Sequence, residues 1–385
     1  MKLHPLVIAV ALATGLGACN RSDTPAAGTE TAVVDQAKLA AELNQLYADY
    51  WEANLKLNPL NATFIGDNRY NAEMPNFFSA EYRRQAHDLS QSWLDKALAL
   101  DGTRLEGPGR ISYEIFVRER QLELEGEKFP DWMMPIDQFT NIAAFVPVLG
   151  SGNSAQPFKT VEDYDNWLKR GAAIPAIYDQ AIANMREGMK AGVVQPKALM
   201  LKVIPQLDAI INDDPAKTTF WGPITNMPKE FSAEDQKRLT EAYRVMIAEQ
   251  LMPAYKRLRA FIADEYLPAT RESVSLSALP DGEAWYAFNA KTQTTTELTP
   301  AEIHEIGLKE VARIQGEMRE VMKQVGFEGD LQAFFKFMTT DKQFMFKDEK
   351  ALLDAYNALR AKIDLKIPEQ FSVLPKAGFE IRPIE

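Results

Sequence analysis

His304 followed by Glu305 is the arrangement in this sequence that comes nearest to a catalytic metal site. The two residues begin the pattern H-E-x-x-H, in which two histidines one helical turn apart hold zinc and the glutamate activates a water molecule. Position 308 is Leu308, so the second zinc ligand is missing. Since His304 lies beside an apolar helical stripe, we expect it to be a partly buried histidine at the start of a helix.

No other residues of the sequence form a complete catalytic set. Beyond the N-terminal leader, a Ser–His–acid arrangement could use only His87 or His304, each on an expected helix. The motifs G-x-S-x-G, G-x-x-x-x-G-K-[ST] and G-x-G-x-x-G do not occur. His87 lies between Arg84 and Asp88, which is typical of a solvated helix residue. We therefore expect no catalytic residue, no metal ligand set and no cofactor in this chain.

Aromatic and hydroxyl side chains near residue 290 could line a binding site. Trp285 and Tyr286 precede a run of three threonines, Thr294, Thr295 and Thr296. Aromatic faces bind apolar groups and hydroxyls orient polar ones, so these five residues are candidates for the lining of a substrate channel. Ordinary aromatic packing followed by a hydroxyl-rich turn would give the same pattern, and both interpretations stay open.

The N-terminus predicts export and lipid attachment. An apolar run at residues 6–16 follows Lys2 and ends in small residues before Cys19, the one cysteine of the 385 residues. This is the pattern of a signal peptide, and the run is too short to cross a bilayer core of about 30 Å. We expect cleavage after residue 18, lipidation of Cys19 and anchoring in a membrane. By resemblance to Gram-negative lipoproteins, Asn20 favours the outer membrane, facing the periplasm.

Composition limits the partners of the chain. The net charge is −11 and the sequence has no basic cluster, which argues against nucleic acid. No segment approaches 18 uninterrupted apolar residues, so we expect membrane contact through the anchor alone. With one cysteine there is no intramolecular disulfide, and stability must come from the core that 46% apolar residues can build.

Hydrophobic periodicity predicts a mainly α fold, an elongated multi-helix array. Residues 19–34 read as a flexible tether, and residues 35–385 as one helical domain, with a division into two lobes near 215–230 as a variant. Caps and apolar spacing predict helices at 39–55, from 79, at 111–124, 160–191, 195–211, 232–266, 299–325, 330–339 and 348–365.

Two segments depart from the helical pattern. Residues 126–158 are rich in proline and in large apolar side chains, and we expect a long functional loop. Residues 371–375 and 379–382 alternate like short strands. The sequence then stops at Glu385 without a turn or a charged tail, so early truncation is a further hypothesis.

An ordered set of segments resembles one bacterial lipoprotein family, that of domain of unknown function 885. The segments are 59–67, 111–114, 134–139, 156–160, 163–164, 184–188, 294–296 and Thr-Pro-Ala-Glu-Ile-His-Glu-Ile-Gly-Leu at 299–308. The resemblance implies a helical fold similar to the zinc metallopeptidases related to angiotensin-converting enzyme and thimet-type oligopeptidases. In that family the presumed metal segment lies C-terminal to everything in this chain, so no metal ligand carries over. Zinc is then expected only in a longer protein.

These observations support two hypotheses of function. The preferred one is the N-terminal part of a membrane-anchored lipoprotein that resembles a zinc-dependent peptidase and is not catalytic alone. Residues 126–158 and 282–298 would then line a peptide-binding channel, and the C-terminal part of the chain would expose apolar surface. The alternative is a non-catalytic, lipid-anchored helical protein for binding or assembly.

Overall fold

The computed structural model describes residues 27–139 and 141–382, with side chains from residue 35 onward. The expected signal peptide, Cys19 and the first part of the tether lie outside the described residues. The structure is 73% helix and 1% strand, which confirms the mainly α class. Two compact units are present, unit 1 ending at Thr296 and unit 2 beginning at Glu297, so the division does not fall at the expected position near 215–230.

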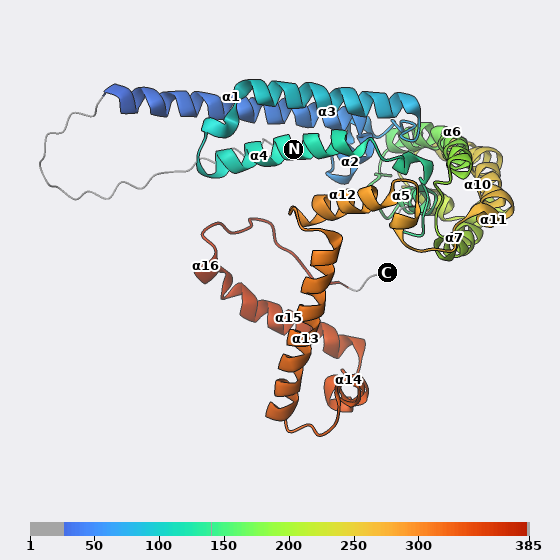
Figure 1. The fold of residues 1–385 in the computed structure, drawn as a ribbon. Helices are drawn as coiled ribbons and strands as arrows, with labels where there is room; N and C mark the ends of the chain where they lie inside the picture. The colour runs from blue at the N-terminus through green and yellow to red at the C-terminus, as the bar shows by residue number, and fades with distance from the viewer. Residues whose placement is uncertain (1–26, 140, 383–385) are drawn as a thin grey trace, which may run out of the picture. The chain divides into compact units, whose positions relative to one another are not determined.

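Three long helices form the first part of unit 1. α1 (Ala27–Leu57), α3 (Ala80–Leu100) and α4 (Gly107–Gly126) run alongside one another (Figure 1). Their apolar stripes meet in a core that includes Leu43 and Tyr113. α1 begins eight residues before residue 35, where the helical domain was expected to start. The end of the expected tether at 19–34 is therefore helical.

The second part of unit 1 surrounds the largest core of the molecule. Its buried residues include Trp167, Tyr178 and Tyr255. Its longest helix is opened by a capping box in which Thr160 and Asp163 exchange side-chain and backbone hydrogen bonds, as the sequence predicts. The main elements are α2 (Pro59–Phe64), α5 (Ile142–Leu149), α6 (Val161–Ala191), α7 (Lys197–Ile210), α9 (Ala233–Val245), α10 (Met252–Ala260) and α11 (Leu267–Ala269).

The helical run from α9 to α11 contains two π-helical turns, Met246–Leu251 and Phe261–Tyr266. Each turn ends shortly before a proline, Pro253 and Pro268 respectively. A proline inside a helix cannot donate a backbone hydrogen bond, and its ring crowds the carbonyl four residues earlier. The widened turns relieve that crowding, so the helix predicted over 232–266 continues past Pro253 with a π turn before it.

The expectation of one long loop over 126–158 is wrong, because α5 lies inside it. Residues 142–149 are apolar on all sides, and such a helix has no amphipathic period to reveal it. Pro147 leaves the carbonyl of Ala143 without its usual helical partner. The hydroxyl of Tyr255 donates to that carbonyl at 2.7 Å, so a distant side chain replaces the missing hydrogen bond.

Unit 2 consists of helices with little buried surface. It contains α13 (Pro300–Gln324), α14 (Leu331–Thr340), α15 (Glu349–Asp364) and α16 (Ile367–Gln370). A capping box of Thr299 and Glu302 opens α13, which lies within the helix predicted at 299–325. Among the hydrophobic residues described in this unit, Met322 and Phe334 alone are buried. The expected apolar surface is present, and it includes Leu308, Val311, Ile314, Val321, Leu359, Ile363, Phe371 and Val373.

Two expectations for unit 2 are wrong. His304 is exposed rather than partly buried, because the neighbouring apolar stripe of α13 is itself exposed. Residues 371–382 form no strand, since no neighbouring extended segment of the described chain pairs with them; its one β-bridge joins Pro196 to Arg271. Among the described helices, none is both long enough and apolar enough to cross a membrane.

Arg170 ties α6 to distant segments of unit 1. Its guanidinium is fully buried and donates to the carbonyls of Glu73 (2.9 Å) and Tyr70 (3.1 Å) and to the hydroxyl of Thr63 (2.8 Å). It also donates to the side-chain oxygen of Gln156. Burial lowers the pKa of Arg170 to about 10, so the group stays protonated at neutral pH. A cation that binds neutral oxygens in this way fixes two segments against one helix.

Replacement of Arg170 by methionine should therefore destabilise unit 1 by about 3 kcal/mol or more, because several buried oxygens lose their donors at once. The matched control is Arg257→Met, which removes an exposed ion pair with Asp179 and should cost less than about 1 kcal/mol. Urea unfolding followed by circular dichroism measures both. Equal losses in the two variants would contradict the role given to Arg170.

Candidate functional site

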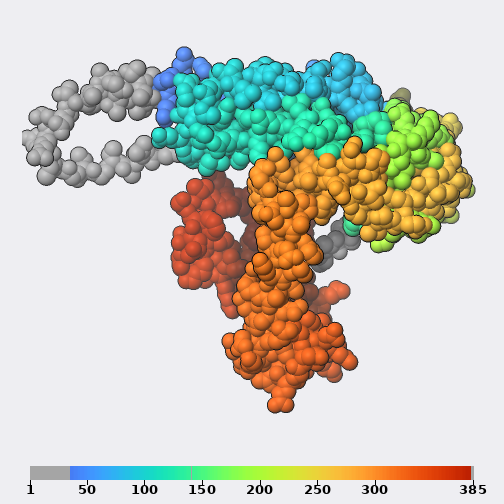
Figure 2. Space-filling view, in the orientation of Figure 1, coloured from blue at the N-terminus to red at the C-terminus, as the bar shows by residue number. Residues whose placement is uncertain are grey.

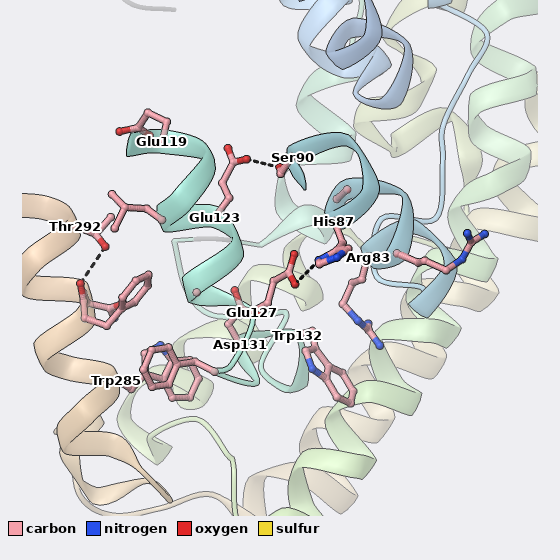
Figure 3. Close-up of a pocket in the computed structure, with 17 residues that line it drawn as sticks. Arg83, His87, Ser90, Glu119, Glu123, Glu127, Asp131, Trp132, Trp285 and Thr292 are labelled. Carbon is pink, nitrogen blue, oxygen red and sulfur yellow. Dashed lines mark hydrogen bonds and ion pairs between the residues drawn. The ribbon is translucent and has the colours of Figure 1, made fainter. Parts of the chain in front are cut away.

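A cavity of about 690 Å³ lies within unit 1, around the C-terminal end of α4. α3, α4, η3 (Asp131–Met133) and α12 (Gly282–Thr294) line it (Figure 3). The space-filling view shows the side chains of α12, in orange, directly against those of α4, in teal (Figure 2). The cavity thus brings together the start of the 126–158 segment and the 282–298 segment, the two stretches expected to line a channel. The described lining comprises Arg83, Arg84, Ala86, His87, Ser90, Glu119, Leu122, Glu123, Gly126, Glu127, Phe129, Asp131, Trp132, Trp285, Phe288, Asn289 and Thr292.

One wall of the cavity is aromatic. Phe129 stacks on Trp285 with ring centroids 5.6 Å apart and planes 9° apart, and Phe288 lies 5.3 Å from Phe129. Phe129 and Trp285 belong to a small core with Val193 and Leu279, which are also buried. Because Trp285 is only 6% exposed, this core fixes α12 to the end of α4. The result is a rigid apolar surface.

A row of carboxylates follows α4 into η3. Glu119, Glu123 and Glu127 are spaced four residues apart, a spacing that keeps side chains near one face of a helix, and Asp131 follows at the start of η3. Glu123 accepts hydrogen bonds from the hydroxyl of Ser90 at 2.5 Å and from Nε of Arg120 at 2.8 Å, and it links α4 to α3. The C-terminal half of α4 carries the carboxylates of Glu119, Glu123 and Glu125 and the guanidinium groups of Arg118 and Arg120.

His87 has a role that the sequence does not reveal. Its side chain is 46% exposed, in line with a solvated helix residue, but Nδ1 lies 2.8 Å from Oε2 of Glu127 and the residue lines the cavity. Glu127 is forty residues away in the chain. Spacings of four and three residues place Arg83, His87 and Ser90 on one face of α3. This shared face is the one local signal in the sequence that could have grouped these residues.

Arg83 and Trp132 form a second contact at the cavity. The guanidinium lies 4.2 Å from the centre of the Trp132 ring and donates to the carbonyl of Phe78 at 2.9 Å. Asp131 is exposed as a residue, but nearby protein atoms partly desolvate its carboxyl group. This desolvation raises the pKa of Asp131, and the nearby charge of Arg83 offsets part of the rise.

The five residues proposed as channel lining are divided by the structure. Trp285 lines the cavity. Tyr286 is exposed and does not line it, because the next position of a helix points to another side. Thr294, Thr295 and Thr296 lie at the end of α12, where the hydroxyls of Thr294 and Thr296 are 2.9 Å apart. Thr292, two residues before Thr294, lines the cavity in their place.

The described residues do not fit a zinc site. No group of three histidine, cysteine, aspartate or glutamate side chains among them could hold a metal ion, and His87 and His304 belong to different units. What the cavity offers is an aromatic wall, carboxylates and two arginines. These are groups that bind and orient a ligand.

The environment of Asp131 predicts a pH-dependent stability difference. Since burial raises its pKa, the folded protein holds this proton more tightly than the unfolded chain, and the ionised carboxylate weakens folding as the pH rises. Asp131→Asn should therefore raise the thermal midpoint at pH 7, and the gain should vanish below the ordinary aspartate pKa of about 3.9. Glu187→Gln on exposed α6 surface is the control. Differential scanning calorimetry at pH 7 and below the ordinary aspartate pKa measures the thermal midpoints. A lower midpoint for Asp131→Asn than for the unaltered protein at pH 7 would contradict the raised pKa of Asp131.

Comparison with known proteins identifies a solved structure with a similar fold. No curated protein sequence matches the chain. A crystal structure described as "the putative lipoprotein from Colwellia psychrerythraea" matches with a TM-score of 0.75 and 18% sequence identity. The match covers 90% of this chain and 62% of that one, so this chain spans less than two thirds of the length of its structural neighbour.

A family model described as "Bacterial protein of unknown function (DUF885)" matches residues 59–385. That range is most of the chain and includes every residue that lines the cavity. The chain belongs to the DUF885 family of bacterial proteins.

Proposed function

We propose that this chain is the N-terminal part of a lipid-anchored protein and that its cavity binds peptide, without catalysis by these residues alone. The cavity at the end of α4 is the observation that carries the proposal. Its size suits a few residues of an extended peptide, with an aromatic wall for apolar side chains and carboxylates for polar ones. Anchoring through Cys19 is supported by the N-terminal sequence pattern and by the description of the structural neighbour as a lipoprotein. The proposed place at the outer membrane, facing the periplasm, rests on Asn20 alone.

A resemblance to zinc peptidases remains part of the proposal for the whole protein. The chain spans 62% of the structural neighbour, and unit 2 exposes an apolar surface that further residues could cover. Metal ligands and a general base would then come from residues beyond those described. No chemical step is assigned to this chain.

The alternative is a non-catalytic protein for binding or assembly. The exposed apolar side chains of α13 and α15 favour it, because contiguous apolar surface of this kind marks sites of association. Zinc content and peptide turnover separate the two proposals.

Filling the cavity should abolish peptide binding. Asn289 is an exposed residue of α12 that lines the cavity, so Asn289→Trp places a large side chain in it without removing core contacts. Ala287→Trp puts the same side chain on an exposed position of α12 outside the lining and serves as the control. Isothermal titration of the detergent-solubilised full chain with terminally blocked Gly-Phe-Lys-Gly should show at least tenfold weaker binding for Asn289→Trp alone, a change of about 1.4 kcal/mol. Equal binding by both variants would exclude the cavity as the site.

The chain as given, purified without a histidine tag, should hold no stoichiometric zinc and should hydrolyse no peptide. Atomic absorption and a peptide-release assay measure these quantities. Tightly bound zinc in this chain would contradict the proposal that its residues lack a metal site. In a longer protein that includes this chain, zinc together with turnover that a chelator abolishes would reject the non-catalytic alternative.

A further inference from the structure

We propose that the cavity selects ligands that carry positive charge, such as a lysine or arginine side chain of a peptide. This inference rests on the proposed function, because it names the chemical class of ligand for the same cavity. It draws on the balance of charge in the lining, on the polarity of α4 and on the cations that the protein already places on the aromatic rings.

The lining is acidic. Four carboxylates, those of the row on α4 and η3, face two arginines. Arg84 pairs with Glu81 and Asp88, neither of which lines the cavity, so its charge is balanced elsewhere. Among the three glutamates of the row, Glu119 has the longest ion-pair distance, 3.6 Å to Arg118, and its side chain is about half exposed. It is therefore the glutamate most available to a ligand.

The end of α4 adds to the negative field. A helix C-terminus carries partial negative charge, and cations near it are the favourable arrangement. The last turn of α4 contains no basic residue and holds Glu123 and Glu125; Glu127 follows the helix directly, and Lys128 after it pairs with Glu125. Arg120 offsets part of this charge through its hydrogen bond to Glu123. The field in the cavity favours a positive group and opposes a negative one.

The protein's own cations show what the aromatic rings of the cavity attract. Arg83 lies over Trp132 at 4.2 Å from the ring centre, and Nζ of Lys128 is 5.0 Å from the ring centre of Phe129. These are cation–π contacts, in which a positive group faces the electron-rich side of a ring. Arg83 thus occupies one of these rings as a cationic ligand would. The cation–π contacts are independent of the carboxylate row.

The test compares three terminally blocked peptides on the full chain in detergent: Gly-Phe-Lys-Gly, the same peptide with norleucine for lysine, and the same peptide with glutamate. Norleucine keeps the length of the lysine stem and removes its charge. The lysine peptide should bind about tenfold more tightly than the norleucine peptide, and the glutamate peptide should bind least. The preference should weaken as salt rises from 50 to 500 mM, since salt screens exposed charges.

Protein variants assign the preference to the carboxylates. Glu119→Gln should weaken the lysine peptide about fivefold and leave the norleucine peptide unchanged, whereas Glu187→Gln on α6 should change neither. If all three peptides bind equally and Asn289→Trp blocks them, peptide binding stands and the charge preference is wrong. If none of the three binds, the proposed function and this inference fail together.

Discussion

The stack of Phe129 on Trp285 gives unit 1 its cavity. It fixes α12 against the end of α4, and with Val193 and Leu279 it forms a small core distinct from the larger one around α6. Burial of each large apolar side chain contributes about 1.5–3 kcal/mol, so a cluster of this size holds a helix firmly. Gly188 lets α6 lie close to η3 and to Val193. A Cβ at this position would lie 2.4 Å from the carbonyl oxygen of Val193 and 3.0 Å from that of Met133. The cavity wall is therefore part of the packing of the unit.

Unit 1 combines two kinds of constraint. Around Arg170 a buried cation binds backbone and side-chain oxygens of α2, of the segment that follows it and of Gln156. Around Phe129 the constraint is apolar packing alone. The carboxylates of α4 lie outside both cores, where water and neighbouring side chains can share them. A rigid frame next to a charged, accessible row is the arrangement expected of a binding surface. The described part of unit 2, residues 297–382, has no comparable core, and its apolar faces are exposed.

The sequence predicted those features of the fold that a few neighbouring residues determine. Thr160 and Thr299 begin helices because their side chains and the acidic residues three positions later satisfy backbone N–H groups, and the pattern is visible in a few letters. α5 was missed because it is apolar on all sides, contains Pro147 and obtains its missing hydrogen bond from Tyr255, 112 residues away. In the candidate site, too, some residues could be predicted from local sequence and others could not. Trp285 was found by residue type, whereas the pairing of His87 with Glu127 depends on how α3 packs against α4, which no local pattern carries. His304 was misplaced because an amphipathic stripe predicts burial, and that stripe is exposed in unit 2.

The central claim is that a peptide occupies the cavity at the end of α4. Six tryptophans are spread through the described chain, and two of them, Trp132 and Trp285, line the cavity. Fluorine NMR of the 5-fluorotryptophan-labelled chain, assigned by single Trp→Phe variants and titrated with blocked Gly-Phe-Lys-Gly, reports on each position separately. The account predicts saturable shifts of the Trp132 and Trp285 signals, with those of Trp51, Trp93, Trp167 and Trp221 unmoved. Shifts confined to these four, or no shift at any tryptophan, would contradict it.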